Sequence, residues 1–82
     1  MKKIAQHIYQ YTAIFELNEN KGYTVTVPAL SGLVTEGKNL EEARMMAEDA
    51  IRCYIGGLKK VQEIIPLEKE VAQIRLSVKV LY

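Results

Sequence analysis

The chain has 82 residues, of which 49% are hydrophobic and 26% charged, with two prolines and five glycines. This composition excludes a disordered, collagen-like or low-complexity chain and predicts one globular domain over residues 1–82. Eleven Lys and Arg balance ten Asp and Glu, which argues against a strongly charged surface for nucleic acid or an anionic membrane. No stretch approaches the roughly 20 apolar residues of a spanning helix. We therefore expect a cytoplasmic protein with no membrane partner.

Two segments with strand periodicity open the chain. Residues 8–17 place aromatic and apolar side chains at the odd positions, and residues 23–27 alternate in the same way. Residues 18–22 between them are typical of a turn, in which Gly22 and the asparagines can take positive φ. We therefore predict an antiparallel hairpin. Pro28 ends its second strand, because proline has no N–H for the ladder.

A turn at residues 29–32 and a short third strand at 33–36 lead into a helix over about residues 40–60. Asn39 is the expected N-cap, and Glu42 completes a capping box with it. Apolar positions spaced by three and four predict the side of the helix that faces the sheet. These positions are Leu40, Ala43, Ala47, Ala50, Ile51, Tyr54 and Leu58.

The helix carries more apolar side chains than one sheet face needs. Met46 and Cys53 widen the apolar arc on one flank, and Ile55 widens it on the other. Met45 lies outside this arc, among charged residues. These extra apolar positions predict a homo-oligomer.

Residues 74–80 alternate once more, with Ile74, Leu76, Val78 and Val80 apolar and the residues between them polar. This pattern predicts a last strand with one solvated face. The predicted order is β-β-β-α-β, an α+β fold in which one mostly antiparallel sheet has a helix packed on one face. A parallel return of the last strand to this sheet would be a right-handed crossover.

Several short motifs, in this order, resemble the HicB-like antitoxin family. They are Gly22-Tyr-Thr-Val-Thr-Val-Pro28, Leu30-Ser-Gly32, Thr35-Glu-Gly37, Leu40-Glu-Glu-Ala43 and Ile65-Pro66. The resemblance covers about residues 9–66, and its specificity comes from the order and spacing of motifs that are weak singly. The family-matching positions, interpreted mainly as determinants of the fold, are Gly22, Tyr23, Pro28, Leu30, Gly32, Thr35, Gly37, Glu42 and Ala43.

The resemblance implies a partial ribonuclease-H-like fold and a non-enzymatic role. The family masks small toxins of the HicA-like type, which resemble double-stranded-RNA-binding domains and cut messenger RNA. Many members also carry a C-terminal DNA-binding module. Here the chain ends at Tyr82, immediately after its last predicted strand, so we do not expect direct DNA binding.

Two other functions stay open on the sequence. A degenerate metal-dependent nuclease would need several carboxylates around a divalent metal, but the first strand offers only Glu16 and the last strand none. A nucleic-acid-binding regulatory module would need basic residues between its stacking aromatics, and these are absent. We therefore predict a protein that is not an enzyme, with no catalytic, metal-binding or cofactor-binding residue.

The sheet face opposite the helix is the predicted partner surface, because it mixes polar and apolar side chains. An exposed strand edge offers a second way to bind, by adding a strand of another chain. The residues assigned to the partner surface are Gln10, Thr12, Ile14, Thr24 and Thr26, with Met45 on the helix; Glu16, Arg75, Ser77 and Lys79 would join the sheet face.

Overall fold

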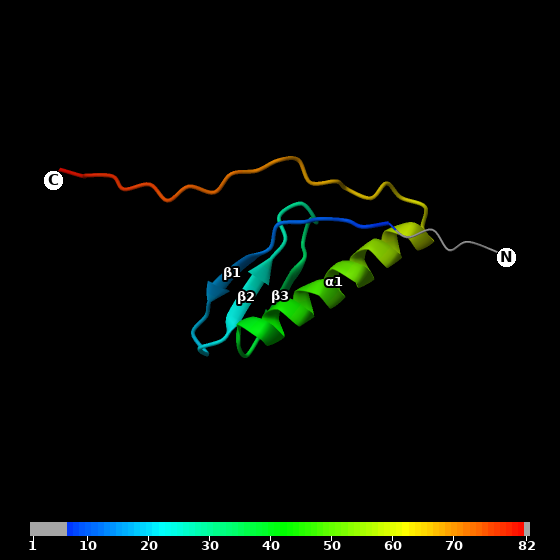
Figure 1. The fold of residues 1–82 in the computed structure, drawn as a ribbon, viewed down its shortest axis with the longest axis horizontal. Coiled ribbons are helices and arrows are strands. Elements are labelled where there is room, and N and C mark those ends of the chain that lie inside the picture. Colours follow the sequence, from blue (N-terminus) through cyan, green and yellow to red (C-terminus); the bar gives the residue numbers. More distant parts are fainter. Residues whose placement is uncertain (1–6, 82) are drawn as a thin grey trace.

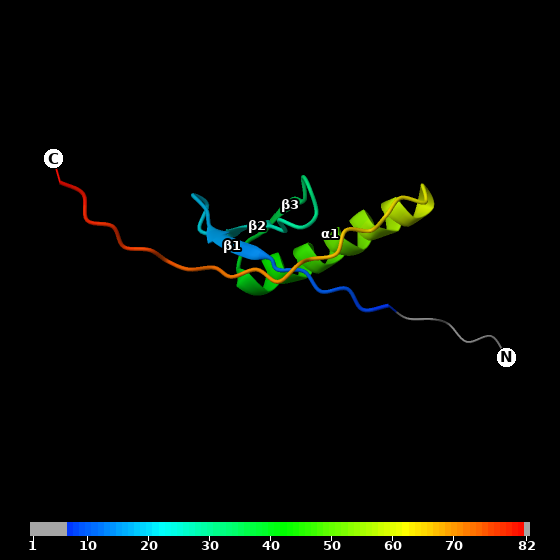
Figure 2. The ribbon, with the colours of Figure 1, turned by 90° about the horizontal axis from the view of Figure 1, so that it is seen from above.

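The computed structural model describes residues 7–81, and within them the chain forms three strands followed by one helix (Figure 1). The strands are β1 (Ile14–Leu17), β2 (Tyr23–Thr26) and β3 (Val34–Gly37), and the helix is α1 (Leu40–Lys60). The sheet is an antiparallel meander in the order β1-β2-β3. α1 lies across one face of it, mainly on β3 and β2 (Figure 2). The predicted α+β class, with one antiparallel sheet and a helix on one face, is confirmed.

The hairpin of β1 and β2 is present, but its first strand is shorter than the predicted 8–17. Pairing runs from Ile14 opposite Thr26 to Leu17 opposite Tyr23. β1 begins only at Ile14, because β2 stops at Thr26 and Pro28 two residues later has no N–H to extend the ladder. The stretch before β1 is therefore without a strand partner.

The turn between β1 and β2 differs from the prediction in which residue takes positive φ. Lys21, not Gly22 or an asparagine, has a φ of 63°. The Asn18 side chain accepts hydrogen bonds from the N–H groups of Asn20 and Gly22, both at 3.0 Å. Position 22 requires glycine because there is no room for a side chain. A Cβ there would lie 2.3 Å from the carbonyl oxygen of Gly37, at the end of β3.

The core consists of two small clusters under α1. In the first, Val25 of β2 is fully buried against Ala43 and Ala47 of the helix. The absence of a Cβ on Gly37 lets β3 and α1 approach closely, since a Cβ there would lie 2.3 Å from the backbone nitrogen of Ala43. The alanines of the helix stripe therefore do what the sequence predicted, which is to bring the helix backbone near the sheet.

The second cluster is built on the loop between β2 and β3. Val27, Leu30 and Leu33 are buried there, and Gly32 takes a φ of 78° to close the loop. The Tyr54 hydroxyl donates to the carbonyl of Ser31 at 3.0 Å, which ties the middle of α1 to this loop.

The helix has the predicted bounds, with one correction to its apolar stripe. Leu40, the first residue of the helix, was expected to face the sheet but is 55% exposed. Of the extra apolar positions, Ile55 is buried and Cys53 is exposed. At the N-terminus, the Asn39 side chain accepts from the N–H of Glu42 at 2.8 Å, as expected for an N-cap.

The predicted last strand is not formed. After a turn at residues 61–62, residues 63–81 form an extended segment without strand pairing, and this segment runs past β1 and away from the sheet (Figures 1 and 2). Its apolar positions, expected to lie in the sheet, are 64–78% exposed at Ile74, Leu76, Val78 and Val80. The β-β-β-α part of the predicted order is therefore present, and the final β is an unpaired segment.

Candidate partner-binding surface

The sheet face opposite α1 is open, and its residues are fixed by the strand register. Cross-strand partners share a face, so Ile14, Thr26 and Val34 form one row across the sheet. Glu16, Thr24 and Glu36 form the next row. The rows that alternate with these two point to the helix, as the buried Val25 shows. We call the surface formed by these two rows the open sheet face.

The open sheet face is partly apolar. Val34 is 61% exposed and Ile14 is half-buried, with threonine between them in the row. The second row places a threonine between two carboxylates. Such a mixture of aliphatic, hydroxyl and charged groups suits contact with another protein.

Not all predicted surface residues lie on this face. Ile14, Thr24 and Thr26 come together as expected, but Gln10 lines a groove beside α1. Met45 is 64% exposed on α1, on the other side of the sheet (Figure 2). Sequence reasoning missed Val34 and Glu36, although a paired register for the third strand would have placed both beside Thr26 and Thr24.

The groove beside α1 lies between the helix and the stretch that leads into β1, and has a volume of about 680 Å³. Tyr9 and Tyr11 stack here, with ring centroids 6.4 Å apart. The Lys59 ammonium stands 5.8 Å from the centre of the Tyr9 ring, a cation–π contact. Burial, together with neighbouring Tyr9 and Glu68, raises the pKa of the Tyr11 hydroxyl. This hydroxyl stays protonated and donates a hydrogen bond.

The base of the C-terminal segment is attached at the same place. The Tyr11 hydroxyl donates to the carbonyl of Pro66 at 2.6 Å. The N–H and hydroxyl of Thr12 donate to the two carboxylate oxygens of Glu68, at 2.5 and 2.6 Å. These two bonds hold the pKa of Glu68 below its usual range, the hydroxyl more than the N–H. Thr12, predicted as a partner residue, is thus already engaged within the chain.

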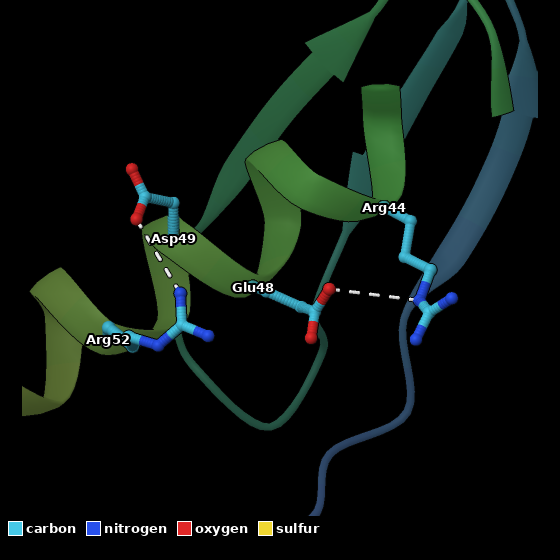
Figure 3. Close-up of polar contacts among 4 residues, drawn as sticks. All are labelled: Arg44, Glu48, Asp49 and Arg52. Carbon is cyan, nitrogen blue, oxygen red and sulfur yellow. Dashed lines mark ion pairs between the residues drawn. The ribbon is translucent and has the colours of Figure 1, made fainter. Parts of the chain in front are cut away.

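The outer face of α1 carries charged side chains that pair along the helix (Figure 3). Arg44 pairs with Glu48 at 3.7 Å, and Arg52 pairs with Asp49 at 3.6 Å. All four side chains are largely exposed, so these pairs mark a solvated face.

Among residues 7–81, no three His, Cys, Asp or Glu side chains cluster closely enough to hold a metal ion. Asp49, the one aspartate, is paired with Arg52 on the outside of the helix. The acidic residues of the sheet, Glu16 and Glu36, lie in separate edge strands with Thr24 between them.

These features define a small α+β domain with an open sheet face, a groove beside its helix and an extended C-terminal segment that is attached at its base. The chain belongs to the HicB-like antitoxin family: the family profile, described as "HicB_like antitoxin of bacterial toxin-antitoxin system", matches residues 11–79. The match includes the C-terminal segment as well as the sheet and helix.

Three UPF0150 proteins are similar to this chain and support this membership. A UPF0150 protein of Thermoplasma acidophilum is 47% identical, over 70% of this chain and 83% of its own length. A UPF0150 protein of Helicobacter pylori is 40% identical, over 68% of this chain and 89% of its own length. A third, from Synechocystis, is 33% identical over 77% of this chain and 80% of its own.

No solved structure matches the chain. In the part of the chain described here, α1 is too polar to cross a membrane.

Proposed function

We propose that this protein is the antitoxin of a toxin–antitoxin pair and that it acts by covering the RNA-binding surface of a small, HicA-like toxin that cuts messenger RNA. Family membership supports the general role. The observation that carries the binding mode is the open sheet face, where Ile14, Thr26 and Val34 form an unobstructed, partly apolar row.

Steric inhibition needs no chemistry from the antitoxin, since occupying the toxin's surface is enough to exclude RNA. We therefore propose a non-enzymatic protein that uses no cofactor. Its place would be the cytoplasm, where a messenger-RNA-cutting toxin finds its substrate. The near-neutral charge of the chain favours a protein partner over nucleic acid.

The direct test is co-expression and pull-down with the small protein encoded next to this one, followed by a messenger-RNA cleavage assay. We expect a stable complex, and we expect the partner to cut RNA alone but not in the complex. A partner that binds but has no ribonuclease activity would contradict the toxin assignment.

The open sheet face is tested by Val34→Glu, which puts a charge in the apolar row of the proposed interface. We expect this variant to bind the toxin at least about 10-fold more weakly, because a buried unpaired charge is costly at an interface. Val61→Glu is the matched control: Val61 is 65% exposed, close to the 61% of Val34, but lies at the end of α1. Equal toxin binding by both variants and the wild type would show that the toxin docks elsewhere.

A further inference from the structure

The C-terminal segment has the side-chain pattern of a strand but no sheet to join within the described chain. Ile74, Leu76, Val78 and Val80 alternate with polar residues, and each of the four is at least 64% exposed. The radius of gyration is 16.6 Å, whereas a compact chain of this length has one of roughly 12 Å. An isolated extended segment with one apolar side is unstable in water, so this side needs a cover.

The sheet in turn has an edge without a partner. In the order β1-β2-β3, β1 pairs only with β2, which leaves the outer N–H and C=O groups of β1 free to bind a further strand. Just before β1, the main-chain N–H of Thr12 is satisfied by the carboxylate of Glu68. A side chain thus bonds a main-chain group that a neighbouring strand would otherwise take.

The base of the segment is held beside this edge and runs in the same direction as the chain entering β1. Tyr11 contacts Pro66, and the next residue, Thr12, contacts Glu68, two residues beyond Pro66. Beyond these contacts, residues 71–81 lead away from the sheet, and all of them are exposed. These contacts at residues 66 and 68 therefore hold the start of an unpaired strand beside the β1 edge, from which the strand runs outwards.

A chain that carries both an unpaired edge and an unpaired strand is complementary to a second copy of itself. In two copies related by a two-fold axis, the strand of each copy would pair with the β1 edge of the other, and both pairings would use the same contacts. We propose that residues 72–80 form a strand that is added to the β1 edge of a second copy, so that the protein is a strand-exchanged dimer.

The side chains on the two sides of the added strand fit this placement. With its apolar positions on the helix side, the strand would continue the side of β1 that carries Phe15 and the 69% exposed Leu17. Its other side would then place Arg75 and Lys79 on the open sheet face, next to the row that holds Glu16. Opposite charges on neighbouring strands favour pairing.

The first test is the mass of the full chain in solution by light scattering. We expect twice the 9.3 kDa of one chain for the wild type. The double variant Leu76→Asp, Val78→Asp should halve this mass, because it charges the apolar side of the strand. Ser77→Asp, which adds a charge on the opposite side, is the matched control and should remain dimeric. A monomeric wild type would overturn the proposal.

The second test separates strand exchange from a dimer made through another surface, and it needs no variant that might unfold. In a mixed sample of ¹³C-labelled and unlabelled wild-type chains, isotope-filtered NMR detects contacts between copies only. We expect contacts from the methyl groups of Leu76 and Val78 to Phe15 and Leu17 of the other copy. Contacts confined to one copy would mean that the segment joins its own sheet and would overturn the proposal. Neither experiment involves a toxin, so its failure would leave the proposed function untouched.

Discussion

The sheet-and-helix body (residues 14–60) and the C-terminal segment (residues 63–81) both contain alternating apolar residues, but these are buried in the body and exposed in the segment. Val25 and Val27 in the body are at most 1% exposed, whereas Leu76 and Val78 in the segment are 78% and 77% exposed. Alternation determines which side of a strand is apolar, but it does not determine what covers that side. In the body the cover comes from α1, which follows the sheet directly in the chain.

The energetic difference between the two regions is large. Burying an aliphatic side chain of this size stabilises a protein by about 1.5–3 kcal/mol, as an upper estimate. The body obtains this stabilisation from its own residues. The segment obtains almost none, although it carries four such side chains, Ile74, Leu76, Val78 and Val80.

The body is most sensitive where helix and sheet touch. Ala43→Asp should unfold it, with a loss of more than about 3 kcal/mol, because the carboxylate would be buried against Val25 without a partner. Thermal unfolding followed by circular dichroism measures this.

Met45→Asp is the control for this variant, since Met45 lies two residues away on α1 but is 64% exposed. We expect its melting temperature to stay near that of the wild type. A stable Ala43→Asp protein would mean that the helix stripe packs differently from the arrangement described above.

A smaller effect is expected from Gly37→Ala. Its added Cβ would lie 2.3 and 2.5 Å from the backbone nitrogen and Cα of Ala43, so α1 must move away from β3. The expected loss is about 1–3 kcal/mol, as for an overpacked core, measured by urea unfolding.

Gly56→Ala provides the opposite case in the same helix-containing body. A Cβ at Gly56 meets no atom within 4 Å, and alanine favours a helix interior by up to about 1 kcal/mol over glycine. We expect a small gain in stability. If both glycine variants shift stability in the same direction, close approach at Gly37 is not what requires glycine there.

The sheet-and-helix body was more predictable from the sequence than the C-terminal segment. The helix bounds, its N-cap and the hairpin were predictable, because each depends on residues within a few positions of one another. The length of β1 was not, since it depends on where β2 ends. The open sheet face was predicted only in part: Ile14, Thr24 and Thr26 lie together on it, but Gln10 and Thr12 do not. Val34 and Glu36 were missed, because their placement needs the register of a third strand. The predicted last strand was wrong, because an alternating pattern gives the side chains of a strand but not the strand that it pairs with.

The smallest expected effect concerns the link between the two regions, the bonds from Thr12 to Glu68. Because these bonds hold the pKa of Glu68 below its ordinary value, their contribution is complete above that ordinary value. It is lost as the pH falls through the lowered pKa in the folded protein. Thr12→Ala removes the hydroxyl, the larger cause, so the pKa of Glu68 should rise towards its ordinary value. Thr24→Ala, in the sheet and away from Glu68, is the matched control.

The pKa is measured from the ¹³C shift of the Glu68 side-chain carboxyl during an NMR titration. An unchanged pKa in Thr12→Ala would mean that the hydroxyl does not bind the carboxylate in solution. The circular dichroism of α1 should stay the same across this titration, because no buried residue of the body contacts Glu68 through these bonds. Acid would then weaken the attachment of the segment's base, which the bond from Tyr11 to Pro66 still holds, while the body stays folded. The attachment of the segment and the folding of the body would thereby respond to pH separately.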